Sequence, residues 1–175
     1  MLARSVVASA LFFAAVVTST ARAADPIEVP TGPVILVVKG LISAIQGAEP
    51  QPERAIRFDR AALEKLAQHS LETFTDWTEG RQTFHGVLLS DLLRRVGATG
   101  TELRALALND YEVNIPVADA EAYQVLLALK HNGEYMRIRD KGPIWIIYPN
   151  DRPKSDELGP HNDKMVWQLR QLEVR

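Results

Sequence analysis

Residues 84–98 read FHGVLLSDLLRRVGA, an apolar strand pattern that runs directly into the pattern of a short helix. Ser90 and Asp91 are typical of the first turn of a helix, and the leucines and the valine that follow recur at helical spacing. Gly97 can adopt the left-handed conformation that ends many helices. The stretch therefore predicts a strand followed at once by a helix that stops at Gly97.

The residues before this stretch also alternate between strand and helix patterns. Residues 34–38 are a continuous run of β-branched residues and leucine, which is typical of a buried strand. Residues 55–58 can form a second strand, and Asp59 can cap a helix that should end near His69. Residues 71–75 favour a third strand.

The residues after the stretch predict more strands than helices. Residues 103–108 and 111–115 favour two strands joined by a turn at Asn109 and Asp110, which together make a hairpin. Residues 120–130 favour a helix. The remaining elements are expected at 135–138 (strand), 144–148 (strand) and 165–174 (a helical turn and an edge strand). Because the elements alternate irregularly and show no internal repeat, the sequence predicts an α+β domain with a mixed or antiparallel sheet and short helices.

Composition narrows the possible functions. The chain has 175 residues, which fits one compact domain. Its 20 Lys and Arg side chains are balanced by 22 Asp and Glu, and no dense basic run is present, so we expect no nucleic-acid partner. The chain contains no cysteine. Disulfides, thiolate metal ligands and cysteine nucleophiles are therefore excluded.

The first 23 residues have the pattern of a secretory signal. Arg4 is followed by an apolar run at 6–17 and then by Ala21-Arg22-Ala23, an A-x-A cleavage site. The run is shorter than the roughly 20 residues that span a bilayer, although an uncleaved anchor is the alternative. We therefore expect a signal peptide at 1–23, one domain at 24–175, a periplasmic location and no direct insertion into the membrane.

The common catalytic motifs are absent. The chain contains no G-x-S-x-G, P-loop, G-x-G-x-x-G or H-E-x-x-H pattern. Among the four histidines only His161 has a ligand-like spacing, to Asp163, and such a pair in a polar loop is more often solvated than metal-bound. The sequence therefore predicts no metal site and no catalytic residue.

Aromatic and polar residues gather at the ends of the predicted strands, where binding sites are often built. They are Thr75, Asp76, Trp77, Asn109, Asp110, Tyr111, Trp145 and Tyr148. Indole and phenol rings stack on flat heteroaromatic ligands, and a carboxylate such as Asp76 or Asp110 can accept two parallel hydrogen bonds from adjacent N–H donors. The alternative is that the aromatic residues belong to the core. From the residues alone, the set predicts a pocket for a planar polar ring.

Six segments occur in an order and spacing that resemble the sulfite-oxidase-type molybdopterin-binding fold. They are TFTDW (73–77), FHGVLLSDLLRRVGA (84–98), NDYEVNIP (109–116), LLALKHNGEYM (126–136), GPIWIIYP (142–149) and VWQLRQLEV (166–174). The resemblance extends over about a hundred residues from Thr73 onward. It implies a sulfite-oxidase-like fold with a mixed sheet and short helices.

The sequence departs from this family at two places that matter for chemistry. In the family, the strand corresponding to 73–76 provides a cysteine thiolate that binds molybdenum, whereas this chain offers only the hard oxygens of Thr and Asp there. The family's Gly-Pro-x-Arg element appears here as Gly142-Pro143-Ile144-Trp145, with an indole in place of the cation. The resemblance with these departures implies no molybdenum and no sulfite-oxidase-type catalysis.

With these departures, the chain is similar to the periplasmic pterin-binding proteins of the PruR type. The similarity implies a non-catalytic protein that binds a reduced, unphosphorylated, tetrahydropterin-type pterin and presents it to the periplasmic region of an inner-membrane sensor that controls cyclic di-GMP. The implied walls of the ring site are Trp77, Tyr111, Trp145 and Tyr148. The implied partners of the amino edge of the pterin are Asp76 or Asp110, together with Asn109, and Thr75 would take the position of the metal ligand.

Two other functions stay open at this point. The first is a periplasmic molybdopterin-dependent oxidoreductase, in which the dithiolene of the cofactor alone would hold the metal. The second is an interaction domain with an empty pocket. The polar loop at 149–163 either closes over the ligand, contacts the partner or is a solvated connection.

Overall fold

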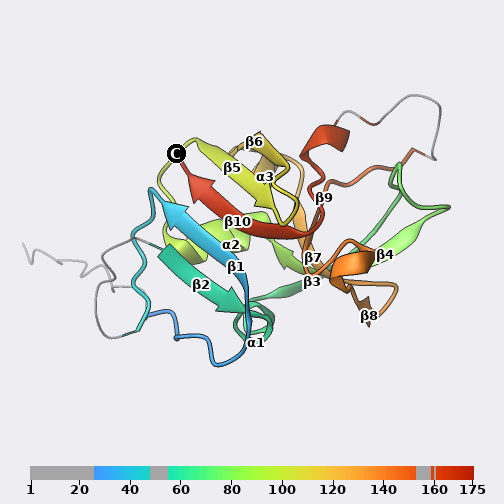
Figure 1. Ribbon diagram of the computed structural model, residues 1–175. Coiled ribbons are helices and arrows are strands. Elements are labelled where there is room, and N and C mark those ends of the chain that lie inside the picture. Colours follow the sequence, from blue (N-terminus) through green and yellow to red (C-terminus); the bar gives the residue numbers. More distant parts are fainter. Residues whose placement is uncertain (1–25, 48–54, 153–158, 160) are drawn as a thin grey trace, which may run out of the picture.

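The computed structural model describes residues 26–47, 55–152, 159 and 161–175. These residues form two β-sheets, with short helices between the strands (Figure 1). The expected signal peptide at 1–23 lies outside the described residues, as do residues 153–158 and 160 of the polar loop. Within the described part of the chain, no helix has the length and apolar character needed to cross a membrane.

The first sheet is mixed and has the strand order β2-β1-β10-β5-β6. Its strands are β1 (Val34–Gly40), β2 (Ala55–Asp59), β5 (Glu102–Ala107), β6 (Glu112–Pro116) and β10 (Leu169–Val174). β1 and β10 are parallel, and the other neighbouring strands are antiparallel. The expected strand at 34–38 and the expected hairpin of β5 and β6 are confirmed.

The last strand does not lie where the sequence placed it. β10 pairs with β1 on one side and with β5 on the other, so the expected edge strand is a central strand. Leu169, Leu172 and Val174 are all buried, as expected for a strand that is covered by the core. The helical turn expected from residue 165 instead precedes it, as the 3-10 turn η2 (Asn162–Lys164).

The second sheet is antiparallel and has the order β3-β4-β7-β8, with β9 also paired to β7. Its strands are β3 (Gln68–Thr73), β4 (Gln82–Leu88), β7 (Leu126–His131), β8 (Glu134–Tyr135) and β9 (Trp145–Ile147). A further 3-10 turn, η1 (Ile138–Asp140), precedes β9. The strand expected at 135–138 is limited to β8, whose last residue is Tyr135.

The helix expected at 120–130 is wrong for most of its length. A helix is present only at α3 (Asp119–Ala122), and Gln124 then has a φ of 51° that no right-handed helix can continue. Residues 126–129 are all buried, because β7 lies between β4 and β9 and is covered by the core. A short, fully buried apolar run can form either a strand or a helix, and here strand pairing decides.

The other two helices have the ends that their sequences favour, with one exception. Asp59 caps α1 (Arg60–Glu64) by accepting the Ala62 N–H at 2.8 Å, and this bond and that from Gly32 lower the pKa of the Asp59 carboxyl. α1 ends at Glu64 and not near His69, because His69 is paired with β4 as part of β3.

Helix α2 (Leu89–Val96) ends as predicted. Gly97 follows it with φ 61° and ψ 49°, which is the left-handed conformation expected of a C-cap glycine. Its N–H and that of Ala98 bond to the last turn of the helix.

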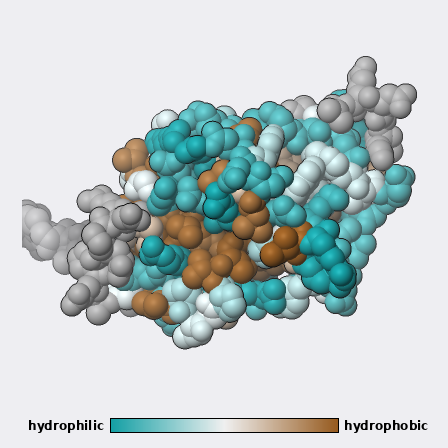
Figure 2. Space-filling view, in the orientation of Figure 1, coloured by the Kyte–Doolittle hydropathy of each residue, from teal (hydrophilic) through white to brown (hydrophobic). Residues whose placement is uncertain are grey.

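The hydrophobic core is one continuous cluster that draws on both sheets and on α2. Leu36 of β1, Leu92 of α2, Phe84 of β4 and Ile146 of β9 are fully buried members. Figure 2 shows that apolar residues also gather on one outer face, over β1 and its neighbours in the first sheet. A mixed α+β architecture of two sheets and few short helices is therefore established, in agreement with the predicted fold class.

Candidate functional site

The three tryptophans of the chain lie together, although they are far apart in the sequence. The ring centroids of Trp77 and Trp167 are 5.2 Å apart, and those of Trp77 and Trp145 are 5.9 Å apart, both in edge-to-face geometry. Trp77 follows β3, Trp145 begins β9 and Trp167 precedes β10. The cluster therefore forms where the end of the first sheet meets the second.

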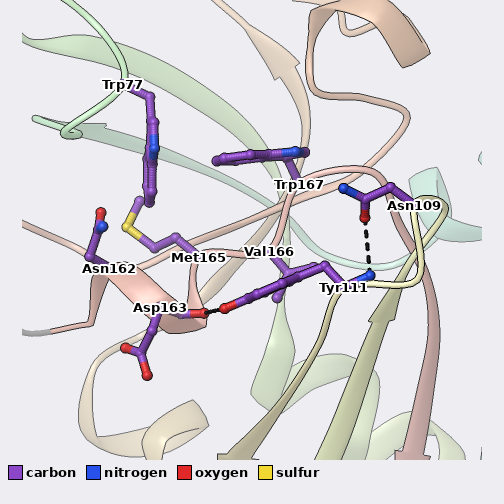
Figure 3. Close-up of a pocket in the computed structure, with 8 residues that line it drawn as sticks. All are labelled: Trp77, Asn109, Tyr111, Asn162, Asp163, Met165, Val166 and Trp167. Carbon is purple, nitrogen blue, oxygen red and sulfur yellow. Dashed lines mark hydrogen bonds between the residues drawn. The ribbon is translucent and has the colours of Figure 1, made fainter.

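A cavity of about 230 Å³ opens beside this cluster (Figure 3). Its lining residues are Trp77, Asn109, Tyr111, Asn162, Asp163, Met165, Val166 and Trp167. The two indoles and the phenol of Tyr111 provide flat apolar walls, and the polar groups are few. This is the usual construction of a site for a small organic ligand.

The turn between β5 and β6 places two of the lining residues. Asp110 has a φ of 63°, a conformation that Asp tolerates better than most residues. The Oδ1 atom of Asn109 accepts the N–H of Tyr111 at 3.2 Å, and the Tyr111 hydroxyl donates to the carbonyl oxygen of Asp163 at 2.8 Å. The phenol therefore links the β5–β6 turn to η2 and fixes one side of the cavity.

A second, smaller cavity of about 40 Å³ adjoins the first. Asn162 and Met165 line both cavities, so these two residues form the boundary between them. The other described lining residues are Phe74, Thr75, Asp76, Tyr148, Pro149, Asn150, Gly159 and His161. Within it, the imidazole of His161 stacks on Tyr148, with ring centroids 4.7 Å apart.

Thr75 is buried, and its hydroxyl is already committed to the protein. It shares a hydrogen bond of 2.8 Å with the Thr78 hydroxyl and accepts the N–H of Trp77 at 3.3 Å. These bonds hold the turn that carries Trp77. The neighbouring Asp76 accepts the N–H of Gly159 at 3.0 Å.

An ion pair also anchors η2. Lys164 donates to Asp119 Oδ2 at 2.8 Å, and the hydroxyl of Tyr148 donates to the same oxygen at 2.9 Å. Asp119 is only 8% exposed and Tyr148 only 1%. Burial is the main cause, and the hydrogen bond to Asp119 the next, that raises the pKa of the Tyr148 phenol far above its usual range. Tyr148 therefore acts only as a neutral donor.

The structure brings six of the eight predicted site residues to the two cavities. Trp77, Asn109 and Tyr111 line the larger cavity, and Thr75, Asp76 and Tyr148 line the smaller one. The remaining two, Trp145 and Asp110, line neither cavity.

These two residues have other contacts. Trp145 is fully buried behind Trp77 and Trp167, and its Nε1–H donates to the Met165 carbonyl oxygen at 3.1 Å. Asp110 is 82% exposed in its side chain and forms an ion pair of 2.8 Å with Arg170. Trp145 thus packs behind the aromatic wall of the larger cavity. Asp110 forms its ion pair with Arg170 and is not among the described lining residues of either cavity.

Sequence reasoning missed the part of the cavity that follows residue 160. Asn162, Asp163, Met165, Val166 and Trp167 all line the larger cavity. Two signals were available: Val166 and Trp167 lie in the segment 166–174, and Asn162 and Asp163 lie in the polar loop at 149–163, for which closure over the ligand was one of the alternatives. Met165 carries no such signal.

No cluster of three or more His, Asp or Glu side chains able to hold a metal ion occurs among the residues that the structure describes. Near the indoles, the cation in contact is Lys141, whose Nζ lies 5.5 Å from the Trp145 ring centroid and 5.7 Å from that of Trp167. Lys141 is one residue before Gly142, so a cation accompanies the altered Gly-Pro element after all. It contacts the indole faces and is not among the cavity-lining residues.

The fold and the cavity together define an α+β domain that is suited to binding a flat heteroaromatic group. Residues 52–151, which are 100 of the 175, match the family model of the oxidoreductase molybdopterin-binding domain. The chain therefore belongs to that family, and the predicted resemblance is confirmed at this level. The search of curated proteins found no match. The matched range ends before Asn162 and Trp167, so five of the eight residues that line the larger cavity lie beyond it.

The two parts of a molybdenum cofactor fit this site unequally. A pterin ring suits the aromatic walls of the larger cavity, and the residues that would hold it are Trp77, Tyr111 and Trp167. The chain has no cysteine to bind molybdenum through sulfur, and the Thr75 hydroxyl is engaged with Thr78 and Trp77. The donor set therefore matches the organic ring and does not match the metal.

Proposed function

We propose that this protein is a periplasmic pterin-binding protein that presents a reduced pterin to an inner-membrane sensor controlling cyclic di-GMP, and that it is not an enzyme. The observation that carries the proposal is the aromatic cavity between Trp77, Tyr111 and Trp167 in a chain without cysteine. Membership of the molybdopterin-binding family supports a pterin as the ligand.

The size of the cavity favours a bare ring system over a large cofactor. Pockets for drug-sized ligands occupy roughly 300–1,000 Å³, and this cavity has about 230 Å³. A bicyclic pterin is smaller than such ligands. The walls offer rings for stacking, which is the contact that a flat heterocycle can use best.

The charges of the lining favour a pterin without phosphate. None of the described residues lining the larger cavity is Lys, Arg or His, and one of them is Asp163. Binding sites for phosphate usually supply cations or clustered backbone N–H groups. A phosphorylated ligand would therefore find no compensating cation among the described lining residues.

The signalling part of the proposal rests on the similarity to PruR-type proteins and on the secretory pattern of residues 1–23. A protein that binds its ligand without converting it can transmit a signal only if a partner recognises its ligand-bound state. The partner we propose is the periplasmic region of a membrane-bound sensor. Cells that produce the Trp77→Ala variant should need about fivefold more pterin for the same control of cyclic di-GMP.

A molybdopterin-dependent oxidoreductase is the second candidate, because the family model that matches the chain carries that description. The two candidates differ in metal content. Protein purified from its own compartment should contain less than a tenth of an equivalent of molybdenum if the first proposal holds. Stoichiometric molybdenum together with turnover of an oxidisable substrate would favour the second.

Binding can be measured directly through tryptophan emission. Because all three tryptophans lie at or directly behind the larger cavity, a stacked pterin should quench most of the emission in a saturable, one-to-one titration. Loss of one stacking wall is worth about 1 kcal/mol, so Trp77→Ala should weaken a tetrahydropterin about fivefold. Calorimetry reads the variant independently of its emission.

Tyr135→Ala is a suitable control, since Tyr135 is an aromatic residue of β8 that lines neither of the two cavities at the tryptophan cluster and instead lines two other hollows of the described structure. It should bind the pterin with wild-type affinity. Absence of saturable binding by folded wild-type protein would contradict the proposed function.

A further inference from the structure

Asn109 is a polar side chain of the larger cavity whose orientation is settled by the backbone. Its Oδ1 atom accepts the N–H of Tyr111 at 3.2 Å, and the reversed amide would place two donors against each other. Among the described residues, this is the one hydrogen bond that the side chain forms. Asn109 is exposed and lines the cavity, so a ligand can reach its Nδ2 donor.

The turn that carries Asn109 is held in place before any ligand binds. Within the turn, the N–H of Ala107 donates to the carbonyl oxygen of Tyr111 at 2.9 Å. From β10, Arg170 donates to the carbonyl oxygen of Ala107 at 3.0 Å and pairs with Asp110 at 2.8 Å. A donor on a fixed turn loses little freedom when a ligand arrives, so one exposed contact is enough to discriminate between ligands.

Figure 3 shows how this donor lies relative to the flat walls of the cavity. The Oδ1 side of the Asn109 amide faces the backbone of Tyr111, and the Nδ2 side is directed toward the Trp167 indole. A ring that packs against Trp167 and the Tyr111 phenol therefore has this donor at its edge. Edge contacts distinguish one heterocycle from another, because stacking accepts any flat ring.

The polar atoms of η2 and of the residue before it do not compete for this role. His161 Nδ1 and Asn162 Oδ1 have almost no accessible surface, so neither faces the open part of a cavity. The Tyr111 hydroxyl donates to the carbonyl oxygen of Asp163, and Figure 3 shows the Asp163 carboxylate directed away from the indoles. Among these groups, Asn109 provides the accessible donor.

We infer that Asn109 selects a heterocycle that carries a ring carbonyl, by donating a hydrogen bond to the carbonyl oxygen. The inference rests on the proposed function, because it assigns the orientation of the pterin in the same cavity. A tetrahydropterin has N–H donors on both of its rings, and the oxygen at carbon 4 is its strongest acceptor. The family resemblance implied that Asn109 meets the amino edge. With its oxygen committed to Tyr111, the amide suits the carbonyl edge instead.

The assignment is tested with two ligands that differ at carbon 4. A tetrahydropterin has an oxygen there, whereas its 4-amino analogue has an amino group, which donates where the oxygen accepts. In anaerobic calorimetry, the wild-type protein should prefer the tetrahydropterin about fivefold, which is the effect of one neutral hydrogen bond. Equal or tighter binding of the 4-amino analogue would contradict the assignment.

Asn109→Asp exchanges the donor for an acceptor at nearly constant shape. Asp can still accept the N–H of Tyr111 and is as favourable as Asn in such a turn, so the fold should be kept. The tetrahydropterin should bind about tenfold more weakly, because a carboxylate repels the carbonyl oxygen. The 4-amino analogue should bind as tightly as before or more tightly. The preference between the two ligands should therefore reverse.

A second variant and a matched control complete the experiment. Asn109→Ser keeps a hydroxyl that can accept the N–H of Tyr111 but is too short to replace the amide donor, so it should bring the preference close to one without reversing it. Asn132→Asp is the control, because Asn132 Oδ1 also accepts a backbone N–H, that of Thr83 at 3.0 Å, and Asn132 lines neither cavity. Both affinities should stay unchanged in the control. Urea unfolding checks the fold of each variant.

The possible failures can be told apart. If the wild-type protein binds the tetrahydropterin and both Asn109 variants keep the wild-type preference, this assignment is wrong and the proposed function stands. Equal weakening of both ligands in Asn109→Asp would mean that the side chain only holds the turn, and an equal change of preference in Asn132→Asp would trace the effect to net charge. Either result also overturns the assignment. If the folded wild-type protein binds neither ligand, the proposed function fails and the assignment fails with it.

Discussion

The ion pair that anchors η2 gives the sharpest prediction about stability. Asp119 accepts from Lys164 at 2.8 Å and from the Tyr148 hydroxyl at 2.9 Å, and its side chain is 12% exposed against 21% for Lys164. Asp119→Ala would leave an almost buried ammonium and a buried hydroxyl without their acceptor. Removing one partner of a buried pair costs about 3–5 kcal/mol. Because Lys164 keeps some contact with water, we expect Asp119→Ala to lower the free energy of unfolding by about 3 kcal/mol, the low end of that range.

A double-mutant cycle isolates the interaction itself. Lys164→Met leaves the Asp119 carboxylate with the Tyr148 donor and should cost about 2 kcal/mol, the value of a hydrogen bond to a charged group. The double variant should cost less than the sum of the two, with a coupling of about 1–3 kcal/mol. Urea unfolding followed by circular dichroism gives each value, provided that the m-value stays constant.

A matched control uses the same substitution at an exposed pair. Lys65 pairs with Glu28, and both side chains are more than 60% exposed, so Lys65→Met should change stability by less than about 0.5 kcal/mol. Additivity of the Asp119 and Lys164 effects to within 0.5 kcal/mol would refute the reasoning. So would an Asp119→Ala protein as stable as the wild type.

Two further predictions concern residues away from the cavity. Burial, and then the charge of Lys141, lower the pKa of His131 below its ordinary value of 6.5, so the unfolded chain binds the proton first as the pH falls. The stability that neutral His131 contributes is fully present above pH 6.5 and is lost as the pH falls through the lowered pKa. The free energy of unfolding should therefore depend less on pH between about pH 7.5 and 5 in His131→Gln than in the wild type. Equal slopes of this free energy against pH in the two proteins would contradict the prediction. Gly97→Ala places a methyl group at φ 61° and against the Ser43 side chain. It should lower the free energy of unfolding, measured in urea, by at least about 1–2 kcal/mol. An unchanged urea midpoint would show that the turn relaxes to accept the side chain.

The elements that the sequence predicted correctly are those with local chemical signals. Gly97 ends α2 because a left-handed residue favours glycine, and Asp59 caps α1 because its carboxylate meets the Ala62 N–H. The hairpin of β5 and β6 follows from alternation and from its turn at Asn109 and Asp110. In each case the decisive contact lies within a few residues along the chain.

The incorrect elements are those decided by distant strands. Residues 126–129 suit a helix or a strand equally well, and the pairing of β7 with β4 and β9 selects the strand. β10 becomes central because β1 and β5, which precede it by many residues, leave a place between them. Periodicity gives the face that a strand buries and not its neighbours, so neither outcome could be derived from local pattern.

The residues of the candidate site also fall into those with a local chemical signal and those whose position depends on distant contacts. The aromatic residues Trp77 and Tyr111 could be selected because of what indole and phenol rings do to a flat ligand, wherever they lie. Asn162 could not be selected by itself, because an asparagine in a polar loop is ordinary until the fold brings it to a cavity wall. Its significance comes from the position of η2, which Tyr111 and the pair of Asp119 with Lys164 fix across long sequence separations.

On the proposed function, in which Thr75 takes the position of the family's metal ligand, the arrangement of the site shows why a ring site does not need that ligand. Thr75 is buried, and its hydroxyl bonds the Thr78 hydroxyl and accepts the N–H of Trp77, so this buried hydroxyl is paired without a metal. The same bonds position the indole that forms one wall of the larger cavity. If the proposed function holds, the side chain at the metal-ligand position is therefore also the one that holds the turn of Trp77.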